Sequence, residues 1–131
     1  MKIPPGFAQL APYLFVDDAV AYMAFLESAF GAVELGRTVA PDGRLANGHM
    51  KLGEVAFMLS EASPPRYPPT QASFYLYVDD ADAALERALS AGASLDMEIG
   101  DMPYGDRQCG VRDPAGNLWW LSQRLVDEPY Y

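Results

Sequence analysis

The chain has 131 residues and half of them are hydrophobic, which is enough for one packed domain and leaves little room for a second core. Eighteen acidic and nine basic residues give a formal net charge of −9, which disfavours nucleic acid as a partner. No run approaches the ~18 apolar residues of a membrane span, and no secretory signal is expected at the start. With Cys109 as the only cysteine, an internal disulfide is impossible, so we expect a cytoplasmic protein.

The first half of the chain predicts a strand, a helix and three further strands. Apolar and aromatic residues over 8–16 favour a strand. Asp17 and Asp18 suit the beginning of a helix over 18–29, which Gly31 would end. Three more strands are expected near 33–40, 44–52 and 54–61.

Four prolines mark the segment that follows: Pro64, Pro65, Pro68 and Pro69. Because proline has no amide hydrogen to donate, residues 62–71 are expected to be extended and to form no sheet hydrogen bonds. This segment would link two modules, about 7–61 and 72–124, within one domain over 1–131.

The second half repeats the first. Residues 75–81 read YLYVDDA, and residues 13–19 read YLFVDDA. A strand over 72–78 and a helix over 80–91, ending near Gly92, are followed by predicted strands near 95–102, 107–113 and 117–124. The order βαβββ therefore occurs twice, and because two repeats are too few for a solenoid, the modules must close on each other.

Strand alternation separates an aliphatic from an aromatic face in each module. Leu14 and Val16 share one face of the first strand, which we expect beneath a helix. The opposite faces of the two matching strands carry Tyr13, Phe15, Tyr75 and Tyr77. Such a surface is apolar but keeps hydroxyl groups for hydrogen bonds, as ligand pockets do. The same residues would also suit a subunit interface or an ordinary core.

Two longer motifs accompany the paired VDDA junctions: PYGDR over 103–107 and VRDPAGNLWW over 111–120. In this order and spacing they resemble the vicinal oxygen chelate superfamily, which includes glyoxalase I, extradiol dioxygenases and fosfomycin- and bleomycin-resistance proteins. The PhnB-like and bleomycin-resistance-like branches are the most similar. The resemblance implies an α+β fold in which two βαβββ modules form an open, curved mixed sheet cup with helices on the convex face.

Enzymes of that superfamily hold a divalent metal with His and Glu side chains from the first and last strand of each module. The resemblance assigns these positions to Ala11, Phe57, Ser73 and Trp120, with Phe57 as the repeat mate of Trp120. Alanine, phenylalanine and tryptophan cannot bind a metal, and a serine hydroxyl is a poor ligand for transition metals. Shifting the register by one residue does not restore a ligand, so no metal cofactor is predicted.

The resulting hypothesis is a metal-free protein that binds, and sequesters, an aromatic or cationic small molecule in an aromatic cup, as a homodimer like its relatives. The candidate ligand-binding residues are Tyr13, Phe15, Phe57, Tyr75, Tyr77, Trp120, Arg107 and His49. Arg107 would clamp an anionic group, or would instead pair with Asp106 to fix the loop. The only histidine, His49, is either structural or a hydrogen-bonding partner of the ligand.

Two alternatives stay open. A glyoxalase-like lyase or isomerase needs a metal or an acid–base pair, for which the only carboxylate in a suitable place is Glu61. Cys109 has no histidine partner in the sequence and is expected to be a small buried residue. The other alternative is a regulatory or interaction dimer whose cup is filled by its own side chains.

Overall fold

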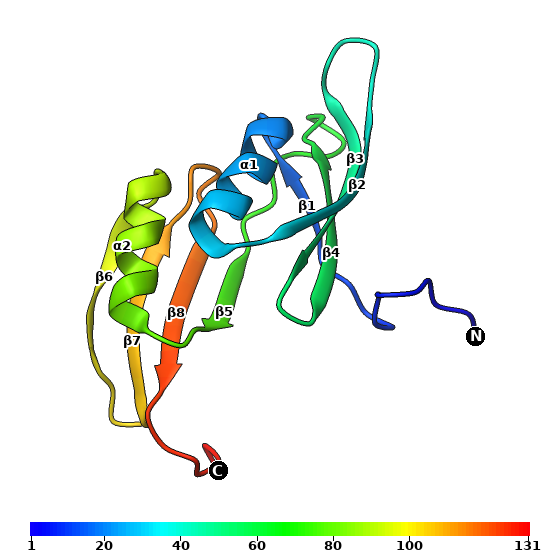
Figure 1. Cartoon of the computed structure of the whole chain (residues 1–131). Helices are drawn as coiled ribbons and strands as arrows, with labels where there is room; N and C mark the ends of the chain where they lie inside the picture. Colours follow the sequence, from blue (N-terminus) through cyan, green and yellow to red (C-terminus); the bar gives the residue numbers. More distant parts are fainter. The chain divides into compact units, whose positions relative to one another are not determined.

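Each half of the chain folds as a strand, a helix and three strands, which confirms the α+β prediction of two βαβββ modules (Figure 1). The computed structural model describes residues 1–131, which divide into unit 1 (Met1–Thr70) and unit 2 (Gln71–Tyr131). Unit 1 contains β1 (Tyr13–Val16), α1 (Ala19–Phe30), β2 (Val33–Val39), β3 (Leu45–Leu52) and β4 (Val55–Glu61). Unit 2 contains β5 (Ser73–Tyr77), α2 (Ala81–Ala91), β6 (Ser94–Asp101), β7 (Asp106–Arg112) and β8 (Leu118–Arg124).

Each unit has its own four-stranded mixed sheet. The strand orders are β1-β4-β3-β2 and β5-β8-β7-β6, so the first strand of each module lies beside the last. That pair is parallel and the other pairs are antiparallel. A parallel pair requires a long crossover, which the helix and the two intervening strands supply. Neither helix has the length and apolar character to cross a membrane.

The helix of each unit covers the aliphatic face of its sheet. In unit 1, Leu14 and Val16 are buried, as the alternation predicts, together with Met23 and Leu26 of α1. A Cβ atom on Gly48 of β3 would lie 2.9 Å from the Met23 sulfur, so α1 approaches the sheet closely. Tyr13 and Phe15 of β1, and Tyr75 and Tyr77 of β5, therefore face away from the helices.

The two helices begin differently. At α2, the Asp80 side chain accepts a hydrogen bond from Ala83 N (3.0 Å), as expected for an N-cap residue. At α1, Asp18 has a left-handed backbone and no capping side-chain bond. Glu61 replaces it and accepts from Asp18 N (2.8 Å) and Ala19 N (3.0 Å). Glu61, the carboxylate considered for an acid–base role, therefore caps a helix.

The proline-rich segment also differs from its prediction. Ser63 and Tyr67 donate backbone hydrogen bonds to each other's carbonyls (2.7 and 2.9 Å), which closes a short loop. Thr70 N then donates to Phe15 O (2.9 Å), and Phe15 N donates to Thr70 Oγ1 (3.2 Å). β1 lies at an edge of its sheet, so Phe15 has backbone groups that would otherwise lack a partner. The residues up to Thr70 therefore belong to unit 1.

Candidate functional site

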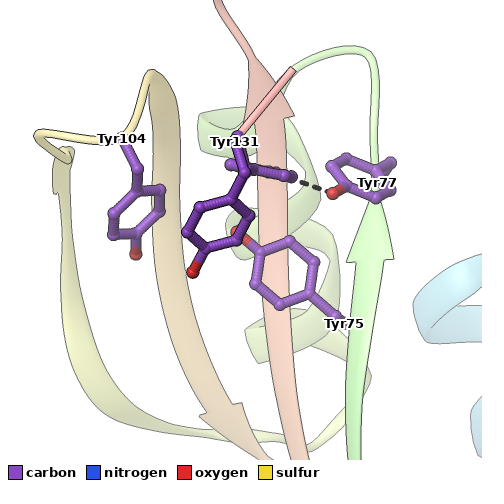
Figure 2. Close-up of a pocket in the computed structure, with 5 residues that line it drawn as sticks. Tyr75, Tyr77, Tyr104 and Tyr131 are labelled. Carbon is purple, nitrogen blue, oxygen red and sulfur yellow. Dashed lines mark hydrogen bonds between the residues drawn. The ribbon is translucent and has the colours of Figure 1, made fainter.

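Five tyrosines line a cavity of about 470 Å³ in unit 2 (Figure 2). Tyr75 and Tyr77 project from β5, and Tyr104 comes from the turn between β6 and β7. Tyr130 and Tyr131 lie in the segment that follows β8. The volume falls in the range of small-molecule pockets, and aromatic walls with a few polar atoms are typical of them.

A buried carboxylate connects the tyrosine hydroxyls. Asp106, the first residue of β7, has no exposed surface. Its Oδ2 accepts hydrogen bonds from the hydroxyls of Tyr75 and Tyr130, the latter at 2.6 Å. Its Oδ1 accepts from Arg124 Nη1 at 2.9 Å. Every oxygen of this buried charge is therefore engaged, as such a charge requires.

These contacts shift the pKa values of the groups around Asp106. Burial raises the pKa of the Asp106 carboxyl, but the hydrogen bonds from Tyr130, Tyr75 and Arg124 together outweigh it, so the pKa lies below its usual value. The hydrogen bond that Tyr130 donates to Asp106 raises the pKa of the Tyr130 hydroxyl. Burial first, and the bond to Asp106 second, raise the pKa of the Tyr75 hydroxyl. At neutral pH the site therefore combines an ionised carboxylate with protonated phenols.

Tyr130 is held by polar contacts at the wall of the pocket. Its hydroxyl lies 2.6 Å from that of Tyr77 (dashed line in Figure 2). Since the single hydroxyl hydrogen of Tyr130 is directed to Asp106, Tyr77 donates in this pair. The guanidinium carbon of Arg124 lies 4.2 Å from the centre of the Tyr130 ring, which is a cation–π contact.

The Tyr104 wall depends on a second hydrogen-bonded chain. The Tyr104 hydroxyl donates to Oε1 of buried Gln108, whose Nε2 donates to Ser122 Oγ at 2.7 Å. Gly105 turns the chain between Tyr104 and Asp106 with a φ of 92°. The positive φ favours glycine, and a Cβ atom there would also lie 2.7 Å from Val126 Cγ2 and 3.1 Å from Arg124 Nη1, so a larger residue would have to displace these side chains.

Among the predicted residues of unit 2, the structure brings Tyr75 and Tyr77 into the pocket. Trp120 lies on the same face of the sheet, beside Tyr75 in the strand register, but does not line the cavity. Arg107 lies on the opposite, helix-covered face. It donates to Asp82 of α2 (2.7 and 3.0 Å) and to Asp101 (2.9 Å), which also raises the pKa of its guanidinium.

Arg107 therefore fixes local structure, and its expected role as an anion clamp is not supported. The alternative expectation, a pair between Asp106 and Arg107, does not occur in the structure. The two residues are adjacent on a strand and so point to opposite faces. Each forms its ion pair on its own side of the sheet.

In unit 1, Tyr13, Phe15 and His49 lie on the uncovered face, but aromatic neighbours from loops pack on them. Phe15 stacks on Tyr67 with ring centres 5.2 Å apart, and Phe7 contacts His49 edge-to-face at 5.2 Å. Tyr13 lies 5.2 Å from Phe15, and its hydroxyl accepts from the amide of Asn47 at 3.2 Å. None of these three predicted residues is among the five that line the pocket of unit 2.

Phe57 is misplaced in the prediction by one residue. In the register, Tyr13 lies beside Met58, just as Tyr75 lies beside Trp120, so Met58 is the repeat mate of Trp120. Phe57 pairs with buried Met50 and is itself buried on the helix side. The error arises because only Gly53 and Glu54 join β3 to β4, whereas residues 113–117 join β7 to β8.

The residues at the superfamily's metal positions do not fit a metal ion. With the corrected register they are Ala11, Met58, Ser73 and Trp120, which offer no carboxylate, imidazole or thiolate. No cluster of three or more His, Cys, Asp or Glu side chains has a geometry that could hold a metal. Cys109 is buried, and its pKa is raised to about 11 by burial and by Asp82, so it is a structural residue.

The sequence interpretation missed three of the five residues that line the pocket, Tyr104, Tyr130 and Tyr131. It also missed the residues that hold them: Asp106 as a buried acceptor, Gln108 and Arg124. One available signal was alternation. Asp106, Gln108 and Gly110 occupy the same face of β7 as the predicted Trp120 of β8. No sequence pattern identifies Tyr130 and Tyr131, because they follow the last strand.

Comparison with known proteins identifies one superfamily. A family model described as the glyoxalase/bleomycin resistance protein/dioxygenase superfamily matches residues 6–121. The protein Rv0887c of Mycobacterium tuberculosis is 37% identical over 124 residues, which is 87% of this chain and 73% of that protein.

Solved structures show the same fold. TioX from Micromonospora sp. ML1 is 26% identical with a TM-score of 0.75, over 91% of this chain and 99% of that one. TnmS3, an antibiotic binding protein from Streptomyces sp. CB03234, has a TM-score of 0.69 over 95% of this chain and 98% of that one. At 24% identity, the likeness to TnmS3 concerns the fold alone.

Proposed function

Since the chain belongs to the glyoxalase/bleomycin resistance protein/dioxygenase superfamily, we propose that it is a binding protein that holds a planar aromatic small molecule, without a metal ion, in the pocket of unit 2. One observation carries the proposal. Five tyrosine rings surround a cavity of about 470 Å³, and the hydroxyls of two of them are fixed by one buried carboxylate. The rings offer stacking surface for a planar ligand, and the hydrogen bond to Asp106 orients the Tyr75 ring before a ligand arrives.

The charge of the protein favours a cationic or neutral ligand over an anionic one. The net charge is −9, and Arg124, which contacts the ring of the pocket residue Tyr130, is already paired with Asp106. TnmS3 offers an analogy for the role, since its name describes an antibiotic binding protein. By this analogy the proposed role is sequestration of an aromatic or cationic compound.

Catalysis is the less favoured candidate. A glyoxalase-like lyase or isomerase needs a general base near the substrate. The hydrogen bonds that Asp106 accepts hold its pKa below the usual range and occupy both of its oxygens, so it is a poor base. Glu61 is engaged with the start of α1.

A matched set of naphthalene compounds tests the proposal. The set carries an aminomethyl cation, a neutral hydroxymethyl group or a carboxylate on the same ring system, and binding is measured by titration calorimetry. We expect saturable binding of the cation and the neutral compound, with the carboxylate weakest. Tyr77→Ala should weaken binding roughly two- to tenfold, the contribution of one aromatic contact.

Tyr67→Ala is the matched control, because Tyr67 is an exposed tyrosine on the aromatic surface of unit 1 (44% exposed, against 55% for Tyr77). The affinity of the Tyr67→Ala variant for the naphthalene compounds should equal that of the parent protein. If none of the three compounds binds, or if Tyr77→Ala and Tyr67→Ala behave alike, the pocket is not a ligand site. If the protein's own residues fill the pocket, none of the three compounds will bind.

The proposal extends to a homodimer in a reducing compartment. β2 is an edge strand on which Val33, Leu35 and Val39 are exposed, and such an edge is a candidate surface for pairing. The single buried cysteine is compatible with reducing conditions. Sedimentation equilibrium should give twice the chain mass, and Leu35→Lys should shift the species to the monomer. A monomeric parent protein would contradict this extension.

A further inference from the structure

The inference starts from the number of hydroxyl groups directed at Asp106. Oδ1 of this fully buried carboxylate is bound by Arg124, and Oδ2 accepts from two phenols, Tyr75 and Tyr130. Tyr75 is fixed in β5, within the sheet. Tyr130 is the donor that does not belong to the sheet, so its position is the exchangeable one.

Tyr130 is held by its polar contacts and by an edge-to-face contact with Tyr104, with ring centres 6.4 Å apart. Its side chain remains 43% exposed, and residues 125–131 form no strand or helix. The segment is attached by Leu125 N donating to Gly105 O (2.9 Å) and by Arg124 donating to the Glu128 carbonyl. Exposed segments of this kind open at low free energy compared with a sheet.

We infer that the Asp106 side of the pocket is a subsite for a phenolic hydroxyl group, and that the ligand's phenol ring takes the place that Tyr130 occupies in the free protein. The inference rests on the proposed function and names the chemical class of its ligand. In the bound state the ligand hydroxyl donates to Asp106 Oδ2 and accepts from Tyr77, while its ring lies over Arg124.

The surroundings of the subsite select this chemistry. A ligand that displaced Tyr130 without offering an O–H group would leave a buried carboxylate short of one hydrogen bond. An anionic group would be repelled by the Asp106 charge. A hydroxyl on a flexible alkyl chain would lack the ring that Arg124 contacts in Tyr130, at 4.2 Å. A neutral aryl hydroxyl satisfies all three conditions.

The test compares 2-naphthol with 2-methoxynaphthalene, which has the same ring system but no O–H group, by calorimetry at neutral pH. In the parent protein we expect 2-naphthol to bind about tenfold more tightly, because a site built around a hydroxyl rejects the analogue that lacks it. Tyr130→Ala removes the competing phenol and should tighten 2-naphthol several-fold further, with no comparable gain for the ether.

Tyr131→Ala is the control variant, because Tyr131 lines the same pocket but does not contact Asp106. It should leave the preference for 2-naphthol over the ether unchanged. Equal binding of the two compounds, or a Tyr130→Ala variant that gains nothing for 2-naphthol, would overturn the inference while the proposed pocket remained. Absence of binding by both compounds to all three proteins would count against the pocket itself.

Discussion

The two units share a scaffold but place different side chains at equivalent positions. In unit 1, Tyr13, Met58 and His49 lie side by side across three strands of the uncovered face. The equivalent row in unit 2 is Tyr75, Trp120 and Gly110. In unit 1, Phe7 packs on His49, whereas in unit 2 Gly110 leaves room for the indole ring of Trp120.

The partners of the two equivalent tyrosines also differ. Tyr13 is bonded to the amide of Asn47, a neutral group near the surface. Tyr75 donates to Asp106, a buried charge that also holds Tyr130 and Arg124. A repeat therefore conserves the backbone and the sidedness of its strands, while the functional site depends on a few positions where the copies diverge.

The largest difference between the units should come from the partners of these two tyrosines, Asp106 and Asn47. Asp106→Ala removes a buried acceptor from three donors, one of them a guanidinium, so we expect a loss of about 3 kcal/mol in the free energy of unfolding. Asn47→Ala removes one bond near the surface and should cost less than about 0.5 kcal/mol. Urea unfolding followed by far-ultraviolet circular dichroism measures both. If Asp106→Ala lowers the free energy of unfolding as little as Asn47→Ala does, the hydrogen bonds to Asp106 add no stability.

A smaller effect is expected where glycine admits the Trp120 ring. A Cβ atom on Gly110 would lie 2.9 Å from Trp120 Cζ3 and 3.3 Å from Met97 Cβ. Gly110→Ala should therefore displace the indole and cost about 1–3 kcal/mol, as overpacking does. Tryptophan fluorescence reports the displacement, since both tryptophans belong to unit 2.

Gly36→Ala is the matched control in unit 1, because nothing lies within 4 Å of a Cβ atom there. It should be neutral or stabilise the protein by a few tenths of a kcal/mol, since alanine restricts the unfolded chain. An unchanged emission spectrum for Gly110→Ala would show that the position of Trp120 does not depend on glycine at position 110.

The sequence was sufficient for the architecture because its signals are local. Alternating strands, the VDDA junctions and turn residues each act over a few positions, and the helix bounds agree with their predictions to within one residue. Asp113 illustrates why. Its carboxylate accepts from Ala115 N, Asn117 N and the Trp119 indole, so one residue fixes the turn before β8.

The site was less predictable because it depends on long-range placement. The error at Phe57 came from counting along a hairpin whose turn differs in length from its counterpart. The pocket needs Tyr104 and Tyr130, which lie outside the strands, and it needs Asp106 to be buried. Aspartate is rarely buried without a partner, and the partner here is eighteen positions away, at Arg124. No local sequence pattern predicts an ion pair between residues so far apart in the chain.

The smallest expected difference compares the two tyrosines directly. Tyr75 and Tyr13 are similarly exposed (44% and 40%), so changing either to phenylalanine removes one hydroxyl from a residue of similar exposure, and only the hydrogen-bond partner differs. Tyr75→Phe should cost about 1 kcal/mol of unfolding free energy, because its hydroxyl serves a charged acceptor, while Tyr13→Phe should lie close to zero. Denaturant titration of the two variants in parallel measures both changes in the free energy of unfolding. Equal values would attribute the difference between the units to the shape of the pocket, whereas the expected gap would place it in the hydrogen bonds to Asp106.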